Sequence, residues 1–536
     1  MVSLVSASLL IGVVSTAGAD ELSVIDNPYQ VVPDGPALLD LSPEAVATRR
    51  RAPAGPAAIA FGDLDKYARD SEPEVDPAEL AKRPGLPPGW VQIGDEVVPE
   101  AVAAGAQVRA RTLPNSLRAD GGDAPQGALA DEICAFPDKV PPGVYVGDWT
   151  PGAEYPRRGT IYLNFVGATL YNGNGENSAE DYSLLAITGH KYPSFGGGED
   201  KAIAVAQAVQ ADFDDWAIRT VYLERPHKTI PYVMTMVGGS YKDTVSGPAG
   251  GVAPSADCED FGLRNVCYSF TNQQGVTTQS NIIGQEIGHT YGLGHTYGKD
   301  RIMAYGYATN GAQDMIFGDD CADIYVAANQ GGACSGVNKC HCGIGEQQDD
   351  KATISAIYAP PGPDIVEPTI EITTPADDET FESGVGIAVN VDVWDDFGGY
   401  GWKMMVYEGD ELLGEKYDYS RIREFGINGL PDGTYEVVVE IEDQADHIVQ
   451  DRITIHIGDA VETAGGETTG GETTGGTDSS GGDSTGADSG SSDAGTSGPG
   501  MDDEEGCSCR SAGPPAAPGA LALGLLMFAS TRRRRT

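Results

Sequence analysis

The stretch QEIGHTYGLGH at residues 285–295 limits the possible folds more than any other part of the chain. On a helix, Gln285 and His289 are four positions apart, so they lie on one face, one turn from each other. Two ligands placed in this way can hold one metal ion. Glu286 is one step round the helix, where its carboxylate can reach a water molecule bound to that ion.

Gly292 follows three residues after His289 and indicates the end of this helix, because glycine tolerates the positive φ that a helix end often needs. The chain can then turn so that His295 approaches the same ion from another direction. Three protein ligands with a fourth position open for water are the layout of a catalytic zinc site. Zinc lowers the pKa of such a water, and Glu286 would accept its proton. The plainer interpretation of Glu286 is an ordinary helix glutamate.

This stretch resembles the metzincin metalloproteases, whose pattern is H-E-x-x-H-x-x-G-x-x-H followed by a methionine turn. The sequence DRIMAYGY supplies that turn, with Met303 eight residues after His295 and Tyr305 two residues later. The resemblance covers the order of elements over the domain and about twenty residues specifically. It implies an α+β protease domain, a zinc cofactor and, as in the astacin and serralysin branches, a role for Tyr305 in stabilising the oxyanion.

The chain departs from the family pattern at Gln285, where a histidine is expected. A neutral amide oxygen is a weaker zinc donor than imidazole. Three alternatives follow. Gln285 coordinates zinc weakly, another group such as His190 or His227 takes the place, or the site binds no zinc and the fold serves as a recognition surface.

Hydrophobic patterns predict a first domain at 141–362 and a second at 366–458. In the first, Ile161, Leu163 and Phe165 alternate as in a half-buried strand, and 200–218 has one apolar helical face. Further strands are expected at 230–237 and 265–272 and a closing helix at 349–359. In the second, period-two alternation at 386–394, 434–443 and 452–457 predicts an all-β sandwich, which resembles the immunoglobulin-like modules of secreted bacterial enzymes.

The ends of the chain carry features of export. Residues 1–19 are apolar and end in Ala-Gly-Ala, as in a secretory signal peptide, and 20–140 are expected to be a pro-region or an irregular segment. The glycine- and threonine-rich residues 459–505 predict a disordered stalk. Residues 506–536 combine cysteines, a short hydrophobic segment and an arginine tail, and they resemble the C-terminal sorting signals of myxobacterial surface proteins.

Seven cysteines lie outside the sorting tail, an odd number, so an exported chain should leave one unpaired. Cys134 could cap the zinc of a latent enzyme, but a disulfide is the simpler expectation, as it is for the KCHC sequence at 339–342. The formal charge of −46 argues against a nucleic-acid partner. It is compatible with Ca²⁺ bound by carboxylates, with the Asp pairs at 319–320 and 349–350 as candidates.

These observations predict an exported protein, attached to the cell surface or released, that contacts a membrane only through its C-terminal segment. The first hypothesis is a zinc endopeptidase acting on extracellular protein or peptide, with His289, His295 and Gln285 at the metal and Glu286 and Tyr305 as catalytic residues. The second is a catalytically inactive metzincin fold, disarmed at Gln285, that binds a partner at the surface.

Overall fold

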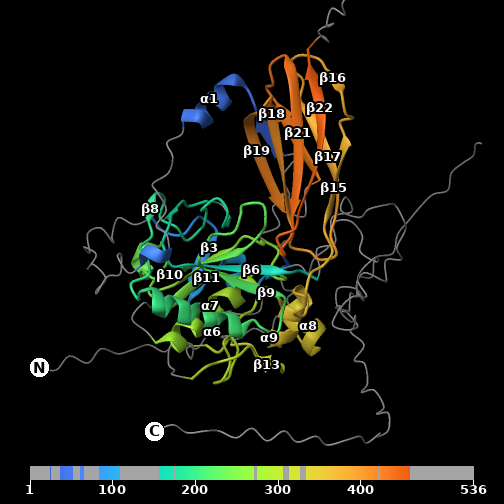
Figure 1. Ribbon diagram of the computed structural model, residues 1–536. Coiled ribbons are helices and arrows are strands. Elements are labelled where there is room, and N and C mark those ends of the chain that lie inside the picture. The colour runs from blue at the N-terminus through green and yellow to red at the C-terminus, as the bar shows by residue number, and fades with distance from the viewer. Residues whose placement is uncertain are drawn as a thin grey trace, which may run out of the picture.

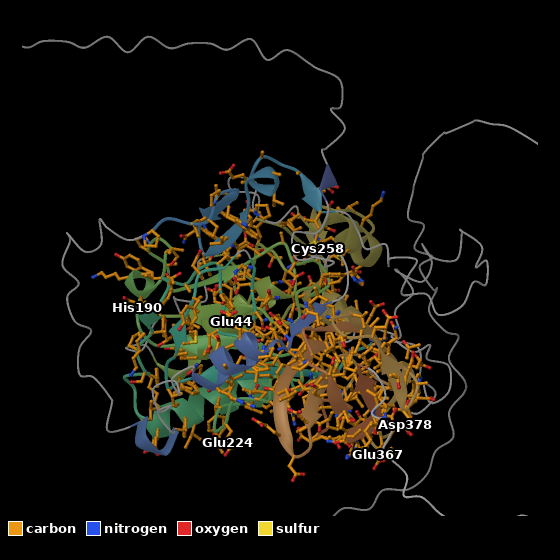
Figure 2. The ribbon with its side chains drawn as sticks, turned by 90° about the horizontal axis from the view of Figure 1, so that it is seen from above. Glu44, His190, Glu224, Cys258, Glu367 and Asp378 are labelled. Carbon is orange, nitrogen blue, oxygen red and sulfur yellow. A yellow bond between two sulfur atoms is a disulfide. The ribbon has the colours of Figure 1, made fainter. Side chains whose placement is uncertain are left out.

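A computed structural model of the chain describes residues 24–25, 37–51, 61–64, 84–108, 156–173, 175–270, 275–305, 313–325, 333–419 and 423–458. It contains a domain of mixed sheet and helices and, beside it, a sandwich of two sheets (Figure 1). From above, His190 and Cys258 lie on the first domain, and Glu367 and Asp378 lie on the sandwich (Figure 2). The predicted signal peptide, stalk and sorting tail lie outside the described residues.

The first domain is built on a seven-stranded sheet, as far as the described residues go. Its strands, in spatial order, are β3 (Trp90–Ile93), β4 (Glu96–Pro99), β11 (Gly251–Pro254), β12 (Val266–Ser269), β10 (Val233–Val237), β6 (Gly159–Asn164) and β9 (Ile218–Val221). Strands β12, β10, β6 and β9 are parallel neighbours, whereas β11 runs antiparallel to β12. Strand β4 then pairs with β11 in parallel and antiparallel with β3.

Helices cover the lower face of this sheet in Figure 1. They are α6 (Glu199–Asp212), α7 (Val276–Thr290) and α9 (Asp350–Ile357). The other helical segments are α1 (Pro43–Arg51), η1 (Phe61–Asp63), α4 (Glu100–Ala103), η4 (Tyr241–Asp243) and α8 (Ser335–Cys342). Three two-stranded ladders pair β1 (Val24–Ile25) with β5 (Gln107–Val108), β7 (Thr169–Leu170) with β8 (His190–Lys191), and β13 (Ala322–Asp323) with β14 (Gln347–Gln348).

The core confirms the predicted alternation in β6 but not its half-buried character. Ile161 and Leu163 pack among the residues of α6 and α7, as expected for the helix-covered face. Tyr162 points into a second core on the other face, together with Tyr192 and Met234. Every residue of β6 is therefore buried, because both faces of the sheet are covered. A central parallel strand with two covered faces is the usual situation in such sheets.

The second domain is a β-sandwich, as the alternating pattern predicted. One sheet has the order β15 (Thr369–Thr374), β17 (Ile387–Trp394), β20 (Glu424–Asn428) and β2 (Ala37–Asp40). The other has the order β16 (Glu379–Phe381), β22 (Ile448–Ile457), β21 (Gly433–Glu442), β18 (Gly401–Glu408) and β19 (Glu411–Tyr419). One shared core joins the two sheets, with Val389, Trp402 and Val437 among its buried residues.

Within the described part of residues 20–140, short regular elements join both domains. Strand β2 pairs in parallel with β20 of the sandwich, whereas β3 and β4 extend the sheet of the first domain. Phe61 and Leu64 lie in the core of that domain. Sequence periodicity missed these elements because each is only three or four residues long.

Candidate metal centre

Helix α7 carries Glu286 and His289 into the interior of the first domain, and both side chains are fully buried. The helix ends at Thr290, Tyr291 is its C-cap, and Gly292 follows with φ +88°. A Cβ atom at Gly292 would lie 2.8 Å from the Cα of Cys258, so this position needs glycine both for its conformation and for the close approach of backbone. The predicted turn is therefore present, and it brings His295 back toward His289.

The two histidines face each other. The Nε2 atoms of His289 and His295 are 3.1 Å apart, and their ring planes are inclined by 80°. His289 Nδ1 lies 2.8 Å from the carbonyl oxygen of Leu293. If Nδ1 carries the proton and donates to this carbonyl, the lone pair of Nε2 points to His295 and to any ion between them. Two nitrogen ligands of one tetrahedral zinc lie about 3.3 Å apart, so the observed spacing fits.

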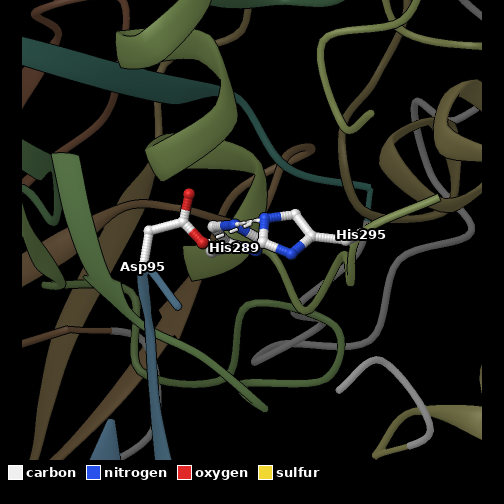
Figure 3. A group of neighbouring side chains, drawn as sticks. All are labelled: Asp95, His289 and His295. Carbon is white, nitrogen blue, oxygen red and sulfur yellow. Dashed lines mark hydrogen bonds and ion pairs between the residues drawn. The ribbon is translucent and has the colours of Figure 1, made fainter. Parts of the chain in front are cut away.

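A third candidate ligand comes from the turn between β3 and β4. Asp95 Oδ1 is 3.1 Å from His295 Nε2, and the ligand atoms of Asp95, His289 and His295 all lie within 4.8 Å of one another (Figure 3). The next residue, Glu96, places Oε1 3.1 Å from His289 Nδ1. Burial acts to raise the pKa of Asp95, but the adjacent imidazoles of His295 and His289 outweigh it, so the pKa lies below its ordinary value. This shift requires charged imidazoles, and a metal held by neutral imidazoles would favour the ionised carboxylate in their place.

Sequence reasoning missed Asp95. The only local signal is the Gly94-Asp95-Glu96 turn between two short apolar runs, and nothing in the sequence relates that turn to a motif so far along the chain. The relation comes from the pairing of β4 with β11, in which Glu96 is opposite Ala253. Because β11 also lies against α7, this pairing brings the turn to the metal motif.

Gln285 lies one helical turn before His289, as predicted. Its amide nitrogen is 3.1 Å from the carbonyl oxygen of Ile302 and 3.4 Å from that of Ala304, so it donates to the backbone on either side of Met303. Coordination of a metal by the amide oxygen of Gln285 stays a prediction. The other predicted substitutes have partners away from the site: His190 Nε2 lies 2.9 Å from Asp243, and His227 Nδ1 lies 2.7 Å from Thr229 Oγ1.

Glu286 occupies a fully buried position between α7 and the start of β11. A Cβ atom at Gly251, the first residue of β11, would lie 2.4 Å from Glu286 Oε1. Neither carboxylate oxygen of Glu286 has a hydrogen-bond partner among the described residues. Burial, and then the charges of Asp95 and Glu96, raise the pKa of Glu286 well above its usual range. A buried carboxyl without partners is costly, and a nearby cation or water would reduce that cost.

Met303 and Tyr305 flank the two histidines. Met303 is fully buried beneath α7, and a Cβ atom at Gly288 would lie 2.5 Å from its sulfur. The ring of Tyr305 meets that of His295 at a centroid distance of 5.0 Å and stacks on Tyr325 at 4.3 Å. Tyr305 is 38% exposed, so it joins the buried site to the surface. Its role toward an oxyanion stays a prediction.

Disulfides fasten the loops around this centre. Cys258 pairs with Cys334, and Cys321 pairs with Cys342, so one cysteine of the KCHC sequence is in a loop-fastening disulfide, as expected. Cys267 is a buried free thiol, and its burial raises its pKa far above the ordinary value. Cys134 lies outside the described residues, so its capping role is untested.

The Asp pairs that were candidates for Ca²⁺ have structural partners. Asp320 forms an ion pair with Arg301. Asp349 caps α9 by accepting from the backbone nitrogen of Ala352 at 2.8 Å, and Asp350 accepts from that of Gly318 at 3.0 Å. Binding of Ca²⁺ by these pairs stays a prediction.

No protein-family model matches the sequence, and no curated protein matches it. Solved structures give partial similarities. A fibronectin(III)-like module of CbhA from Clostridium thermocellum is 20% identical over 17% of this chain and 96% of that one, with a TM-score of 0.15. Catalytically inactive OgpA from Akkermansia muciniphila, solved with an O-glycopeptide substrate, is 10% identical over 58% of this chain and 96% of that one, with a TM-score of 0.17. Scores this low carry no argument about fold or function.

Within the described ranges, no helix has the length and apolar character needed to cross a membrane.

Proposed function

We propose that this protein is a zinc-dependent endopeptidase of the metzincin type whose metal site is closed by its own N-terminal segment. The observation that carries the proposal is the convergence of His289, His295 and Asp95 within 4.8 Å beside the buried carboxyl of Glu286. Two imidazoles and a carboxylate are a ligand set that suits zinc. The glycine turn, the methionine beneath the helix and the strand order around α7 support the metzincin interpretation of the fold.

The residues fit a zinc ion in charge as well as in kind. Asp95, Glu96 and Glu286 bring three carboxyl groups to a site where the described bases are the two imidazoles. A divalent cation would balance this charge and would give the unpartnered oxygens of Glu286 a bound water to contact. When bound, zinc would polarise the peptide carbonyl and acidify its water.

Three residues of the chain would then have separate roles in peptide hydrolysis. Glu286 would accept a proton from the attacking water and pass it to the leaving amine, for which a raised pKa is suitable. Leu293 fixes the orientation of His289 through its carbonyl oxygen. Tyr305, next to His295 and partly exposed, lies where a developing oxyanion could be stabilised on the accessible side.

Closure of the site follows from burial and from strand pairing. His289, His295 and Glu286 are fully buried, so a polypeptide substrate cannot reach them in this arrangement. The edge of β11, where an extended peptide could add as a strand, is occupied by β4. We infer that β3 and β4 must move before the enzyme acts, and that Asp95 then leaves the metal to water.

Hydrolysis of casein tests the proposal. The Asp95→Ala variant, loaded with zinc, should cleave casein faster than the unaltered protein, because the carboxylate no longer competes with water. The control Glu100→Ala changes an exposed acid of the same segment and should leave the rate unchanged. Adding Glu286→Gln to Asp95→Ala should abolish cleavage. Activity that survives in this double variant would overturn the assignment of Glu286.

A second candidate function is a catalytically silent binding module, and the contacts of Gln285 favour it. Its amide nitrogen bonds to the backbone flanking Met303, an arrangement that holds the fold together without any metal. A protein that binds no zinc and does not cleave casein as Asp95→Ala would be such a module.

The setting that we propose is extracellular, with attachment to the cell surface or release. The pairs Cys258–Cys334 and Cys321–Cys342 support it, because disulfides persist in oxidising compartments. The substrate would be extracellular protein or peptide. The β-sandwich, for which we propose an immunoglobulin-like fold, would hold the protease domain on its stalk.

A further inference from the structure

A second group of acidic side chains lies where the two domains meet. Asp364 belongs to the connection between α9 and β15, Asp395 and Asp396 to the loop between β17 and β18, and Asp443 to the loop between β21 and β22. Three separate stretches of chain therefore bring carboxylates to one place. The group is distinct from the candidate zinc centre, with which it shares no residue.

The distances are those of a compact site. The ligand atoms of Asp364, Asp443 and His447 all lie within 4.8 Å of one another. Asp443 is held in position from within its loop: Oδ1 accepts from the backbone nitrogens of Ala445 and His447, each at 2.8 Å, and Oδ2 lies 2.7 Å from His447 Nδ1. His447 thus serves to orient Asp443.

The buried oxygens of this group that lack partners are the observation that points to a ligand. Asp395 and Asp396 are only 4% and 5% exposed, yet the Oδ1 atom of each is buried and has no hydrogen-bond partner within the described part of the chain. Asp364 Oδ2 is likewise buried without a hydrogen bond, although Arg158 Nε lies 3.6 Å away. Native structures seldom leave such atoms unpaired unless an ion or a water contacts them.

The electrostatics show that these carboxyls face one another. Burial, followed by the charges of Asp443, Asp364 and Asp396, raises the pKa of Asp395 to about 9. Burial and the charge of Asp364 raise that of Asp396 to about 6. Among the described residues, the guanidinium that faces these four acids is that of Arg158. Without a further cation the acids must stay partly protonated or repel one another.

We propose that Asp364, Asp395, Asp396 and Asp443 bind a calcium ion at the domain junction. Calcium takes six to eight oxygen ligands, often carboxylates from several loops together with carbonyl oxygens and water. The donors here are carboxylate oxygens, which suit calcium better than the soft-ligand metals. His447 remains a hydrogen-bond partner of Asp443 and does not ligate the ion.

A calcium ion at the domain junction would affect how the sandwich docks on the first domain. The loop that carries Asp443 also docks on the first domain: Gln444 accepts from Thr160 Oγ1 at 2.6 Å and donates to Pro231 O at 3.0 Å. Asp446 pairs with Arg219 through two contacts of 2.9 Å. A calcium ion bound by the interdomain connection and by two sandwich loops would fix this docked arrangement.

The experiment is a calcium titration of the full chain after removal of metals, followed by calorimetry and by thermal unfolding. We expect one calcium per chain with a dissociation constant of about 1 mM or tighter, and a rise in the melting temperature on binding. Asp395→Asn should weaken binding at least about tenfold and remove the thermal shift. Asp392→Asn alters an exposed aspartate of the preceding strand and should retain both.

Two further measurements distinguish calcium binding at the domain junction from binding at the zinc centre and from misfolding of a variant. Repeating the titration with His295→Ala should leave calcium binding unchanged, because that histidine belongs only to the zinc centre. Terbium bound to the unaltered protein should luminesce on excitation of Trp394, the neighbour of Asp395, and calcium should displace it. No calcium binding up to 10-fold above about 1 mM, or a preference for zinc or manganese, would overturn the proposal.

Discussion

Asp95 Oδ1 lies 3.1 Å from His295 Nε2, although 200 positions separate the two residues in the sequence. The contact exists because β4 is hydrogen-bonded to β11, which also lies against α7. It gives the two histidines a third candidate ligand, Asp95, in a chain whose motif has Gln285 in place of the expected histidine. The proposed closure of the zinc site by the N-terminal segment depends on this contact between Asp95 and His295.

The substitution Gln285→His should strengthen zinc binding by at least about tenfold, because imidazole is a better zinc donor than an amide oxygen. Competition against a chelator of known zinc affinity measures the change. His190→Gln is the matched control, since His190 pairs with Asp243 away from the site, and it should leave zinc affinity unchanged. An unaltered affinity in Gln285→His would show that position 285 does not face the ion.

Gly292→Ala should destabilise the domain by about 1–3 kcal/mol or more, because a Cβ there is strained at φ +88° and would meet the backbone of Cys258. Chemical denaturation measures this loss. Gly275→Ala, at a position with open space around it, should change the free energy of unfolding by no more than about 0.5 kcal/mol. Equal effects of the two changes would argue against a strained turn at Gly292.

The free energy of unfolding should fall as the pH rises from about 4 to 8, in part because of Asp212. Burial, and then the charge of Asp314, raise the pKa of Asp212 to about 8. The folded protein therefore keeps a proton that the unfolded chain releases near its ordinary value of 3.8. One such proton contributes a slope of at most about 1.4 kcal/mol per pH unit, with stability lost toward high pH.

The Asp212→Asn variant removes this titration, so its stability should vary less with pH over that range. Denaturation at a series of pH values provides the comparison. Asp214→Asn, an exposed neighbour hydrogen-bonded to Gln210, should retain the slope of the unaltered protein. An unchanged slope in Asp212→Asn would mean that Asp212 is ionised in the fold.

Sequence patterns predicted the helices and strands that are long enough to show a regular spacing of apolar residues. The alternating strands of the sandwich are present as expected, and so is the helix with Val205 and Val209 on one face. That helix ends at Asp212, however, and Ile218 already begins β9, so the predicted range of 200–218 was too long. The turn at Gly292 was also predictable, because its requirement for glycine is local. These features depend on residues that are near one another in the chain.

The sequence could not show which short segments pair when they lie far apart in the chain. Strand β4 has four residues, and its partner β11 is far away in the chain, so neither the occupied sheet edge nor the position of Asp95 has a local signal. The same holds for the acids at the domain junction. Asp364, Asp395 and Asp443 are ordinary loop aspartates in the sequence, and only the folding of two sandwich loops against the connection before β15 brings them together.

The zinc content of the purified protein shows whether His289, His295 and Asp95 hold a metal ion. Elemental analysis after equilibration with zinc at a fixed free concentration should give close to one zinc per chain. His289→Ala should reduce this to a small fraction, and His190→Ala should not. Absence of zinc from the unaltered protein, or an equal zinc content in His289→Ala, would contradict the claim that His289, His295 and Asp95 form a metal centre.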